Sequence, residues 1–294
     1  MYTTLVTATE LKALRDSHAR LMVFDCSFEL MNPAAGEEQY RQSHIPGAVY
    51  AGIDTALSDP GVVEPDGSRH PHADAASGGR HPLPSREKFA MWLSGVGFAN
   101  DMQAVVYDRQ KSNYSGRLWW MLKWAGHDAV AVLDGGLQAW QATGGEVTAS
   151  EEAAHFQTNF TLGEPLRRLV TLQEVLHGLG KGPTLVDARA APRYRGEVEP
   201  LDPVAGRIPG ALNRPSTQNI GADGRFRPAA ELRAEFDSLL QGRDPSDVVM
   251  YCGSGVSAVP NVLAMELAGL DSPGLFAGSW SEWCRDASRP VEKG

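Results

Sequence analysis

A single cysteine, Cys252, stands between an apolar run and a glycine-rich turn. Residues 248–251 predict a buried strand, residues 253–257 read Gly-Ser-Gly-Val-Ser, and residues 258–268 predict a helix. This order places the sulfur among backbone N–H groups near a helix start, where the thiolate is favoured over the thiol. Because the thiolate is the nucleophilic form, we predict that Cys252 is catalytic. The backbone amides expected to stabilise the negative charge belong to Gly253, Gly255, Val256 and Ser257.

A lone cysteine at a strand end is most often a small buried hydrophobic residue. The glycines on both sides of Ser254 favour a functional role instead, because glycine is costly inside regular elements and marks backbone that must curl or approach a ligand. Ser257 fits the N-cap of the predicted helix, and Pro260 fits its first turn. We therefore interpret Cys252 as a functional residue.

Two other chemistries use similar loops. A cysteine-dependent phosphatase needs an arginine six residues after the cysteine, and Ala258 occupies that position. Residues 253–258 also match the dinucleotide pattern G-x-G-x-x-A, but that pattern normally opens a domain, and Asp271 falls in a turn instead of at a strand end. Sulfur transfer fits the loop better. It needs an ionised thiol, N–H donors for an anionic persulfide and a cation for an anionic donor.

The two halves of the chain repeat one order of motifs. Each half begins with a Thr-x-x-Glu capping box, at Thr7 and at Thr171, followed by a predicted helix. A strand ending in aspartate, an Ile-Pro-Gly-Ala segment, a second buried strand and a helix come next in both halves. Each half ends on a glycine turn followed by a tryptophan. Such agreement predicts two copies of one fold.

Short apolar strands alternating with helical segments predict an α/β fold in which each copy has a mainly parallel sheet with helices on both faces. The length of 294 residues fits two domains. We predict domains at 1–148 and 166–294, joined by a linker at 149–165. Residues 66–84, rich in Gly, His and Pro, predict a long loop of the kind that is often functional.

Composition excludes several classes of function. The net charge of −9 argues against nucleic acid as a partner. No apolar run approaches the about 18 residues of a membrane span, and no secretory signal is visible, so we expect a cytoplasmic protein that does not bind membranes. Cys26, Cys252 and Cys284 include no C-x-x-C pair, which argues against a disulfide framework or a cysteine-rich zinc site. Cys26 is expected to be a packing residue and Cys284 to be partly exposed.

On these motifs the chain resembles the two-domain rhodanese family of sulfurtransferases over nearly its whole length. The resemblance implies tandem rhodanese-like domains, a catalytic cysteine in the second half, and no cofactor or metal. It also implies a degenerate first half, and Asp108 agrees, since a carboxylate cannot carry a persulfide. The segments that carry the resemblance are residues 45–48, 79–84 (Gly-Arg-His-Pro-Leu-Pro), 133–136, 186–189, 208–211 and 252–258.

The resemblance extends to the sulfur donor. The Cys-Gly-Ser-Gly-Val loop is similar to the 3-mercaptopyruvate branch of the family, whereas thiosulfate enzymes tend to carry basic residues directly after the cysteine. Either compound is therefore an expected donor, with Arg193 binding the anion. A second arginine is expected after the Glu199-Pro200 pair, where this chain has Leu201. Arg207 is a candidate replacement for the missing cation.

By the same resemblance Ser254 and Asp54 join Cys252 in a polar relay, and His81 lines the substrate site. The expected acceptor is cyanide or a thiol, including a protein thiol such as that of a thioredoxin. A non-catalytic rhodanese-like module that binds persulfides or other proteins is the alternative. Leu201 favours that alternative, and the intact cysteine loop opposes it.

Overall fold

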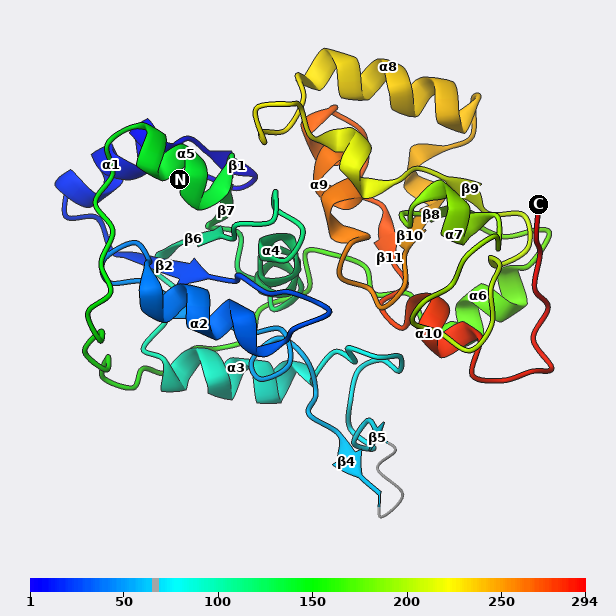
Figure 1. Ribbon diagram of the computed structural model, residues 1–294, viewed down its shortest axis with the longest axis horizontal. Coiled ribbons are helices and arrows are strands. Elements are labelled where there is room, and N and C mark those ends of the chain that lie inside the picture. Colours follow the sequence, from blue (N-terminus) through cyan, green and yellow to red (C-terminus); the bar gives the residue numbers. More distant parts are fainter. Residues whose placement is uncertain (65–68) are drawn as a thin grey trace. The chain divides into compact units, whose positions relative to one another are not determined.

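The computed structural model describes residues 1–64 and 69–294 (Figure 1). Its internal contacts divide the chain into two compact units, which are described separately. The first unit contains Met1–Asp59, Pro84–Leu166 and Ala222–Arg225, and the second contains Pro60–Leu83, Arg167–Gly221 and Phe226–Gly294.

The first unit is built on a parallel sheet with the strand order β1-β7-β6-β2-β3. Alternate side chains of the central strands point to opposite faces, as the pleat requires. Val23 and Val105 belong to the core with α1 and α5, whereas Phe24 packs on the other face against Trp92 of α3. Figure 1 shows α1 and α5 on one side of the strands and α3 on the other. The strands are β1 (Leu5–Val6), β2 (Leu21–Asp25), β3 (Val49–Tyr50), β6 (Gln103–Tyr107) and β7 (Val130–Leu133); the helices are α1 (Ala8–Asp16), α2 (Ala34–Gln42), α3 (Arg86–Gly95), α4 (Ser115–Trp124) and α5 (Gly136–Ala142).

The second unit repeats this plan with the parallel order β11-β10-β8-β9. Val249 and Tyr251 face a core shared with Trp280 and Trp283 of α10. An antiparallel hairpin of β4 (Val62–Val63) and β5 (Arg69–His70) belongs to the same unit. Its other strands are β8 (Thr184–Asp187), β9 (Leu212–Asn213), β10 (Val248–Tyr251) and β11 (Gly274–Leu275); its helices are α6 (Leu172–Gly178), α7 (Ala191–Tyr194), α8 (Ala229–Leu240), α9 (Val259–Leu267), α10 (Ser279–Trp283) and the short 3₁₀ turns Ser216–Asn219 and Pro245–Asp247.

Matched hydrogen bonds confirm the internal repeat and the α/β fold. The hydroxyl of Tyr107 accepts the N–H of Ile45 at 3.1 Å. In the second unit the hydroxyl of Tyr251 accepts the N–H of Ile208 at 3.3 Å. Both predicted capping boxes are also present, so the threonine and glutamate of each box satisfy N–H groups that α1 and α6 leave unpaired.

The long loop predicted at 66–84 is only partly described, because residues 66–68 lie outside the described residues. Arg69–His70 form strand β5, which departs from the predicted loop. Residues 71–84 contain neither helix nor strand, in agreement with the prediction. Gly79 explains how this segment sits on its unit. Its φ of +90° and its approach to the carbonyl oxygen of Gly278, 2.5 Å from an added Cβ, leave no space for a side chain.

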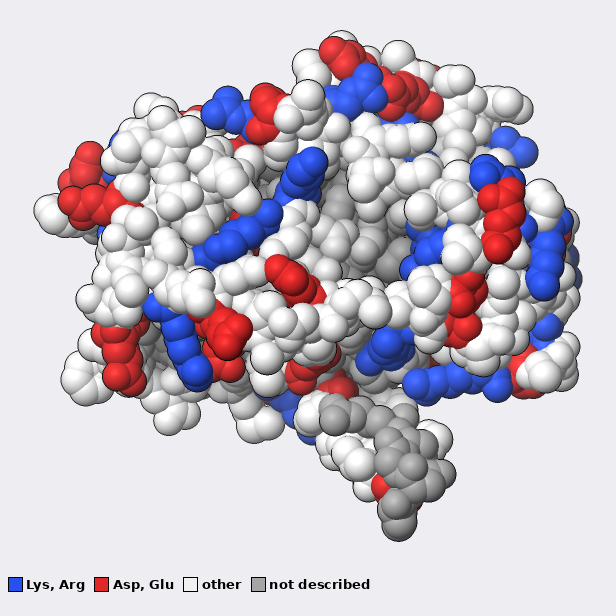
Figure 2. Space-filling model, in the orientation of Figure 1, with Lys and Arg blue, Asp and Glu red and all other residues white. Residues whose placement is uncertain are grey.

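The surface carries both signs of charge. On the face that Figure 2 shows, lysine and arginine side chains are interspersed with aspartate and glutamate instead of forming one basic field. This distribution agrees with the negative net charge and gives no broad electrostatic footprint for nucleic acid on that face. Among the described helices, none has the length and apolar character needed to cross a bilayer.

Candidate active site

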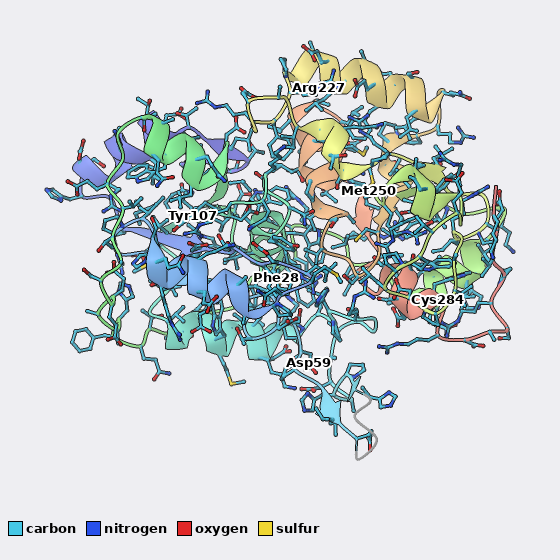
Figure 3. The ribbon with its side chains drawn as sticks, in the orientation of Figure 1. Phe28, Asp59, Tyr107, Arg227, Met250 and Cys284 are labelled. Atoms are coloured by element: carbon cyan, nitrogen blue, oxygen red, sulfur yellow. The ribbon has the colours of Figure 1, made fainter. Side chains whose placement is uncertain are left out.

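Cys252 directly follows β10, whose four residues are all buried, and the label of Met250 in Figure 3 marks this strand. Residues 253–258 then lead into α9, so the predicted strand–loop–helix order is confirmed. The prediction that Ser257 is the N-cap was wrong. Ala258 occupies the N-cap and makes no side-chain hydrogen bond. With a cap at Ser257 the third helical position would be Pro260, which has no N–H, and the N–H at the second position, Val259, donates to the carbonyl of Val256 instead.

The carbonyl groups at the start of the loop are held by α10. The carbonyl of Cys252 accepts the N–H of Trp280 at 3.0 Å, and that of Gly253 accepts the N–H of Ser281 at 2.8 Å. The N–H of Cys252 itself donates to Ser279 Oγ at 3.1 Å. Because C=O and N–H of a trans peptide point in opposite directions, the N–H groups of Gly253 and Ser254 face away from α10.

Gly255 curls the loop. Its φ of +74° lies in the left-handed region, and a Cβ added there would lie 2.1 Å from the carbonyl oxygen of Ala277. Glycine is therefore required both by the backbone conformation and by the close approach of the turn that precedes α10. The sequence predicted that the glycines beside Ser254 occur where the backbone turns sharply, and at Gly255 this prediction is confirmed.

The equivalent loop of the first unit shows what this backbone geometry binds. Asp108 follows β6 as Cys252 follows β10, and it is 1% exposed. Burial raises the pKa of Asp108, and hydrogen bonds from surrounding groups oppose that rise. Its carboxylate accepts four backbone N–H groups at 2.8–2.9 Å, from Gln110, Ser112, Tyr114 and Ser115. The strand–loop–helix unit of this chain thus forms a ring of amides around an anion.

In the second unit several amides of the equivalent loop have no acceptor, although the N–H of Val259, which corresponds to that of Ser115, donates to the carbonyl of Val256 at 3.1 Å. Within the described part of the chain, no acceptor is recorded for the backbone N–H groups of Gly253, Ser254, Val256 and Ser257. Buried N–H groups without acceptors are costly, so this loop is suited to an anion that supplies the missing bonds. Cys252 is 2% exposed, and its sulfur therefore lies in a water-poor environment where such bonds are strong.

Ser254 pairs with a histidine from the long segment after the hairpin. Its Oγ lies 2.8 Å from Nδ1 of His81, and both side chains are buried. His81 therefore contacts the loop through Ser254, and its place in the substrate site stays a prediction. Asp54 lies in a turn after β3 of the first unit and is half-buried. Its part in a relay with Ser254 stays a prediction.

Arg193, at the end of α7, also reaches the loop. A Cβ atom built on Gly253 would lie 3.5 Å from its Nη1. The other side of the guanidinium is fixed, since Nε and Nη2 donate to the carboxylate of Glu199 at 3.1 and 2.6 Å. Glu199 also accepts from Arg189, which is paired with Asp187 at 2.6 Å and therefore has a structural role.

Sequence reasoning missed Arg80 as a site residue. A Cβ built on Gly253 would lie 3.3 Å from Nη2 of Arg80, closer than from Arg193. The other end nitrogen, Nη1, donates to Asp202 at 2.6 Å, and the backbone N–H donates to Ser281 Oγ at 2.9 Å. Its position next to His81 was the available signal, because two neighbours in a bent loop segment can reach one site.

Arg207 does not replace the missing cation. It donates to the carbonyl of Gly294 at 2.6 Å and to the carboxylate of Glu292, and its guanidinium lies 4.3 Å from the ring centre of Tyr194. These contacts hold the C-terminal segment against α7, so the role considered for Arg207 from the sequence was wrong. Leu201 donates its N–H to Glu199 and brings no charge.

The remaining cysteines are packing residues. Cys284, labelled in Figure 3 at the end of α10, is 5% exposed, so the expectation of partial exposure was wrong. Burial raises its pKa to about 11. Cys26 is fully buried as expected, and burial raises its pKa well above the usual range. Both thiols therefore stay protonated and unreactive at neutral pH.

Comparison with known proteins identifies the family. The family described as "Rhodanese-like domain" matches residues 7–143 and 171–286. A Pseudomonas aeruginosa protein named "Probable 3-mercaptopyruvate sulfurtransferase" is 44% identical over 299 residues, covering 99% of this chain and 98% of that one. The mouse "Thiosulfate sulfurtransferase" is 32% identical over 277 residues, covering 91% and 86%.

A solved structure agrees. The crystal structure of SseA from Escherichia coli, whose title names the rhodanese fold and 3-mercaptopyruvate sulfotransferases, matches with a TM-score of 0.77 and 27% identity, covering 95% of this chain and 100% of that one. The catalytic interpretation is thereby favoured over the non-catalytic module. With both halves matched and a cysteine loop of this geometry, the chain belongs to the rhodanese family of sulfurtransferases.

Proposed function

We propose that Cys252 takes a sulfane sulfur from 3-mercaptopyruvate or thiosulfate and passes it, as a persulfide, to cyanide or a thiol. The observation that carries this proposal is a buried cysteine at the start of a loop in which, among the described residues, the N–H groups of Gly253, Ser254, Val256 and Ser257 have no recorded acceptor, with two guanidinium groups beside the next residue. The names of the relatives, which include both donors, support the choice of donor class.

The donor step balances without a cofactor. The Cys252 thiolate attacks the donor sulfur and forms an S–S bond. With mercaptopyruvate the carbon–sulfur bond breaks, and the carbanion equivalent takes the proton of the donor thiol to become pyruvate. With thiosulfate the S–S bond breaks and sulfite leaves. The negative outer sulfur of the persulfide is then stabilised by the amides of Gly253, Gly255, Val256 and Ser257.

The acceptor step restores the enzyme. Cyanide or a thiolate attacks the outer sulfur, and Cys252 leaves as the thiolate, giving thiocyanate or a new persulfide. A small protein thiol such as that of a thioredoxin is the proposed physiological type of acceptor. Because the thiol must stay reduced between turnovers, we propose the cytoplasm as its location.

Charge around the loop favours mercaptopyruvate over thiosulfate. The three arginines near the loop are matched by three carboxylates, so the cluster has no formal excess of positive charge. A donor with one carboxylate binds well to two correctly oriented guanidinium groups. Thiosulfate carries two negative charges and would need a site with excess positive charge. The residues of the cluster are Arg80, Arg189, Arg193, Asp187, Glu199 and Asp202.

Side-by-side kinetics test the function. With cyanide as acceptor, thiocyanate formation is expected with both donors, and kcat/KM for mercaptopyruvate is expected to exceed that for thiosulfate by about tenfold, the effect of one charge-assisted bond. No thiocyanate, pyruvate or sulfite from either donor, with cyanide and several thiols as acceptors, would leave the non-catalytic module as the better account.

Ser254→Ala tests the polar relay. We propose that Ser254, with His81 and Asp54, moves the proton that the donor thiol loses. The variant keeps the loop but removes the hydroxyl that lies 2.8 Å from His81. The rate with mercaptopyruvate is expected to fall about 100-fold, the usual contribution of general acid–base catalysis. The rate with thiosulfate, whose cleavage needs no proton, should change much less. Equal losses with both donors would contradict a proton-transfer role.

A further inference from the structure

We propose that Arg80 is the second guanidinium of the donor site, and that it binds the donor's carboxylate together with Arg193. This inference rests on the proposed function, because it names the group that recognises the donor. It assigns the role to a residue of the segment after the hairpin, far in sequence from both Arg193 and Cys252.

The two arginines meet at Gly253. Nη2 of Arg80 and Nη1 of Arg193 would lie 3.3 and 3.5 Å from a Cβ built on that glycine. In the part of the chain that the structure describes, no acceptor is recorded for either nitrogen, whereas the opposite sides of both guanidinium groups are bonded to carboxylates. The terminal nitrogen of each guanidinium group that has no recorded acceptor is therefore the one beside the residue that follows Cys252.

Asp202 explains how two cations lie so close together. Its carboxylate accepts from Arg80 at 2.6 Å and lies 3.4 Å from Nη2 of Arg193, and its side chain is 4% exposed. Burial raises the pKa of Asp202, while the charge of Arg80 opposes that rise. A carboxylate between the two guanidinium groups offsets their repulsion and holds them in fixed orientation.

The backbone around Arg80 is fixed by the same helix that holds the cysteine loop. Its N–H donates to Ser281 Oγ at 2.9 Å, and the N–H of Ser281 donates to the carbonyl of Gly253 at 2.8 Å. Nε of Arg80 is buried and has no partner within the described residues. Only 27% of the Arg80 side chain is exposed, and its ion pair with Asp202 fixes the guanidinium group. Arg80 is therefore not a freely moving surface cation.

The ligand class follows from this geometry. Two fixed N–H donors of like charge, set side by side next to a thiol, match a planar carboxylate one or two carbon atoms from the reacting atom. A 2-oxo acid with a thiol on the next carbon has this form. Leu201 cannot contribute a cation, and Arg207 is bonded to the C-terminal segment, so Arg80 is the cation that the described structure places beside Arg193.

A pair of alkylating reagents tests the inference without requiring turnover. Iodoacetate and iodoacetamide both alkylate a thiolate with loss of iodide, and they differ in whether a carboxylate or a neutral amide follows the reacting carbon. The rates at Cys252 would be followed by peptide mass in wild type, Arg80→Gln and Arg80→Lys. The ratio of the iodoacetate rate to the iodoacetamide rate is expected to fall about 10- to 100-fold in Arg80→Gln.

The lysine variant separates charge from fork geometry. Arg80→Lys keeps the positive charge and loses the planar pair of donors, so its ratio is expected to lie between those of wild type and Arg80→Gln. Arg285→Gln is the matched control. Arg285 donates to the carbonyl of Gly79 at 3.1 Å, directly before Arg80, and is exposed. Its loss should leave the ratio unchanged, and melting curves would show that each variant is folded.

Two outcomes would overturn the role of Arg80. An unchanged ratio in Arg80→Gln would mean that Arg80 does not bind the carboxylate. An equal fall with both reagents would mean that it acts on the sulfur and not on the ligand. Neither depends on sulfur transfer, so a failure of the proposed function, seen as absent turnover in wild type, is distinguishable from a failure of this inference.

Discussion

Cys252→Ala is expected to gain no sulfur when incubated with donor, and to transfer sulfur at least about 1,000-fold more slowly than wild type. The nucleophile forms the bond that carries the sulfur, so no neighbouring group can substitute for it. Intact mass spectrometry after removal of excess donor checks the prediction. Wild type should show one added sulfur atom and the variant none.

Cys284→Ala is the matched control for this experiment. Cys284 lies in the same unit and is buried, and burial raises its pKa to about 11, so it should not accept sulfur. Removal of one buried sulfur atom should lower the free energy of unfolding by about 1–2 kcal/mol. The variant should still gain one sulfur atom at Cys252. Equal sulfur gain in Cys252→Ala and wild type would show that the carrier is another residue.

The repeat made most of the fold predictable from the sequence. Strands and helices recur in one order, and a parallel sheet follows from short apolar strands separated by helices. Helix ends were predicted less well than strand ends: β10 covers the expected residues 248–251, whereas α9 begins at Val259 and ends at Leu267, each one residue from the expected position. The wrong cap at Ser257 came from reading a residue type without testing which N–H groups follow it.

Long-range contacts account for what the sequence did not reveal. Arg80 belongs to the Gly-Arg-His-Pro-Leu-Pro motif, but the approach of its guanidinium to Gly253 depends on how residues 71–84 fold back onto α10. Ser279 was overlooked for the same reason. It has a φ of +55°, unusual for a residue other than glycine, and its hydroxyl accepts the N–H of Cys252. The equivalent residue of the first unit is Gly136, whose φ is +61°.

That comparison also explains the loop chemistry. In the first unit a carboxylate is built into the amide ring, so the ring stabilises the protein's own side chain. In the second unit a thiol takes the equivalent place, and a sulfur atom offers the amides no strong acceptor until it is ionised or bears a second sulfur. One backbone geometry thus binds a built-in carboxylate in one copy and, in the function proposed above, an anionic intermediate in the other.

Gly255→Ala is expected to lower sulfur transfer by about 100- to 1,000-fold while leaving Cys252 in place. The new methyl group would lie 2.1 Å from the carbonyl oxygen of Ala277, in a backbone conformation with φ of +74°. Either the loop or the segment before α10 must move. Since Trp280 and Ser281 of α10 hold the loop carbonyls, either movement turns the amide ring away from the sulfur.

The same substitution should lower the free energy of unfolding by about 2–5 kcal/mol, from left-handed strain and overpacking together. Gly210→Ala is the control, because Gly210 has a φ of +76° in the same unit but no atom within 4 Å of an added Cβ. The free energy of unfolding of Gly210→Ala should fall by only about 1–2 kcal/mol, and its rate of sulfur transfer should equal that of wild type. Thiocyanate assays and denaturant curves of both variants measure the two effects. A wild-type rate in Gly255→Ala would mean that the amide ring does not stabilise the persulfide, because the ring cannot keep its geometry with a methyl group at this position.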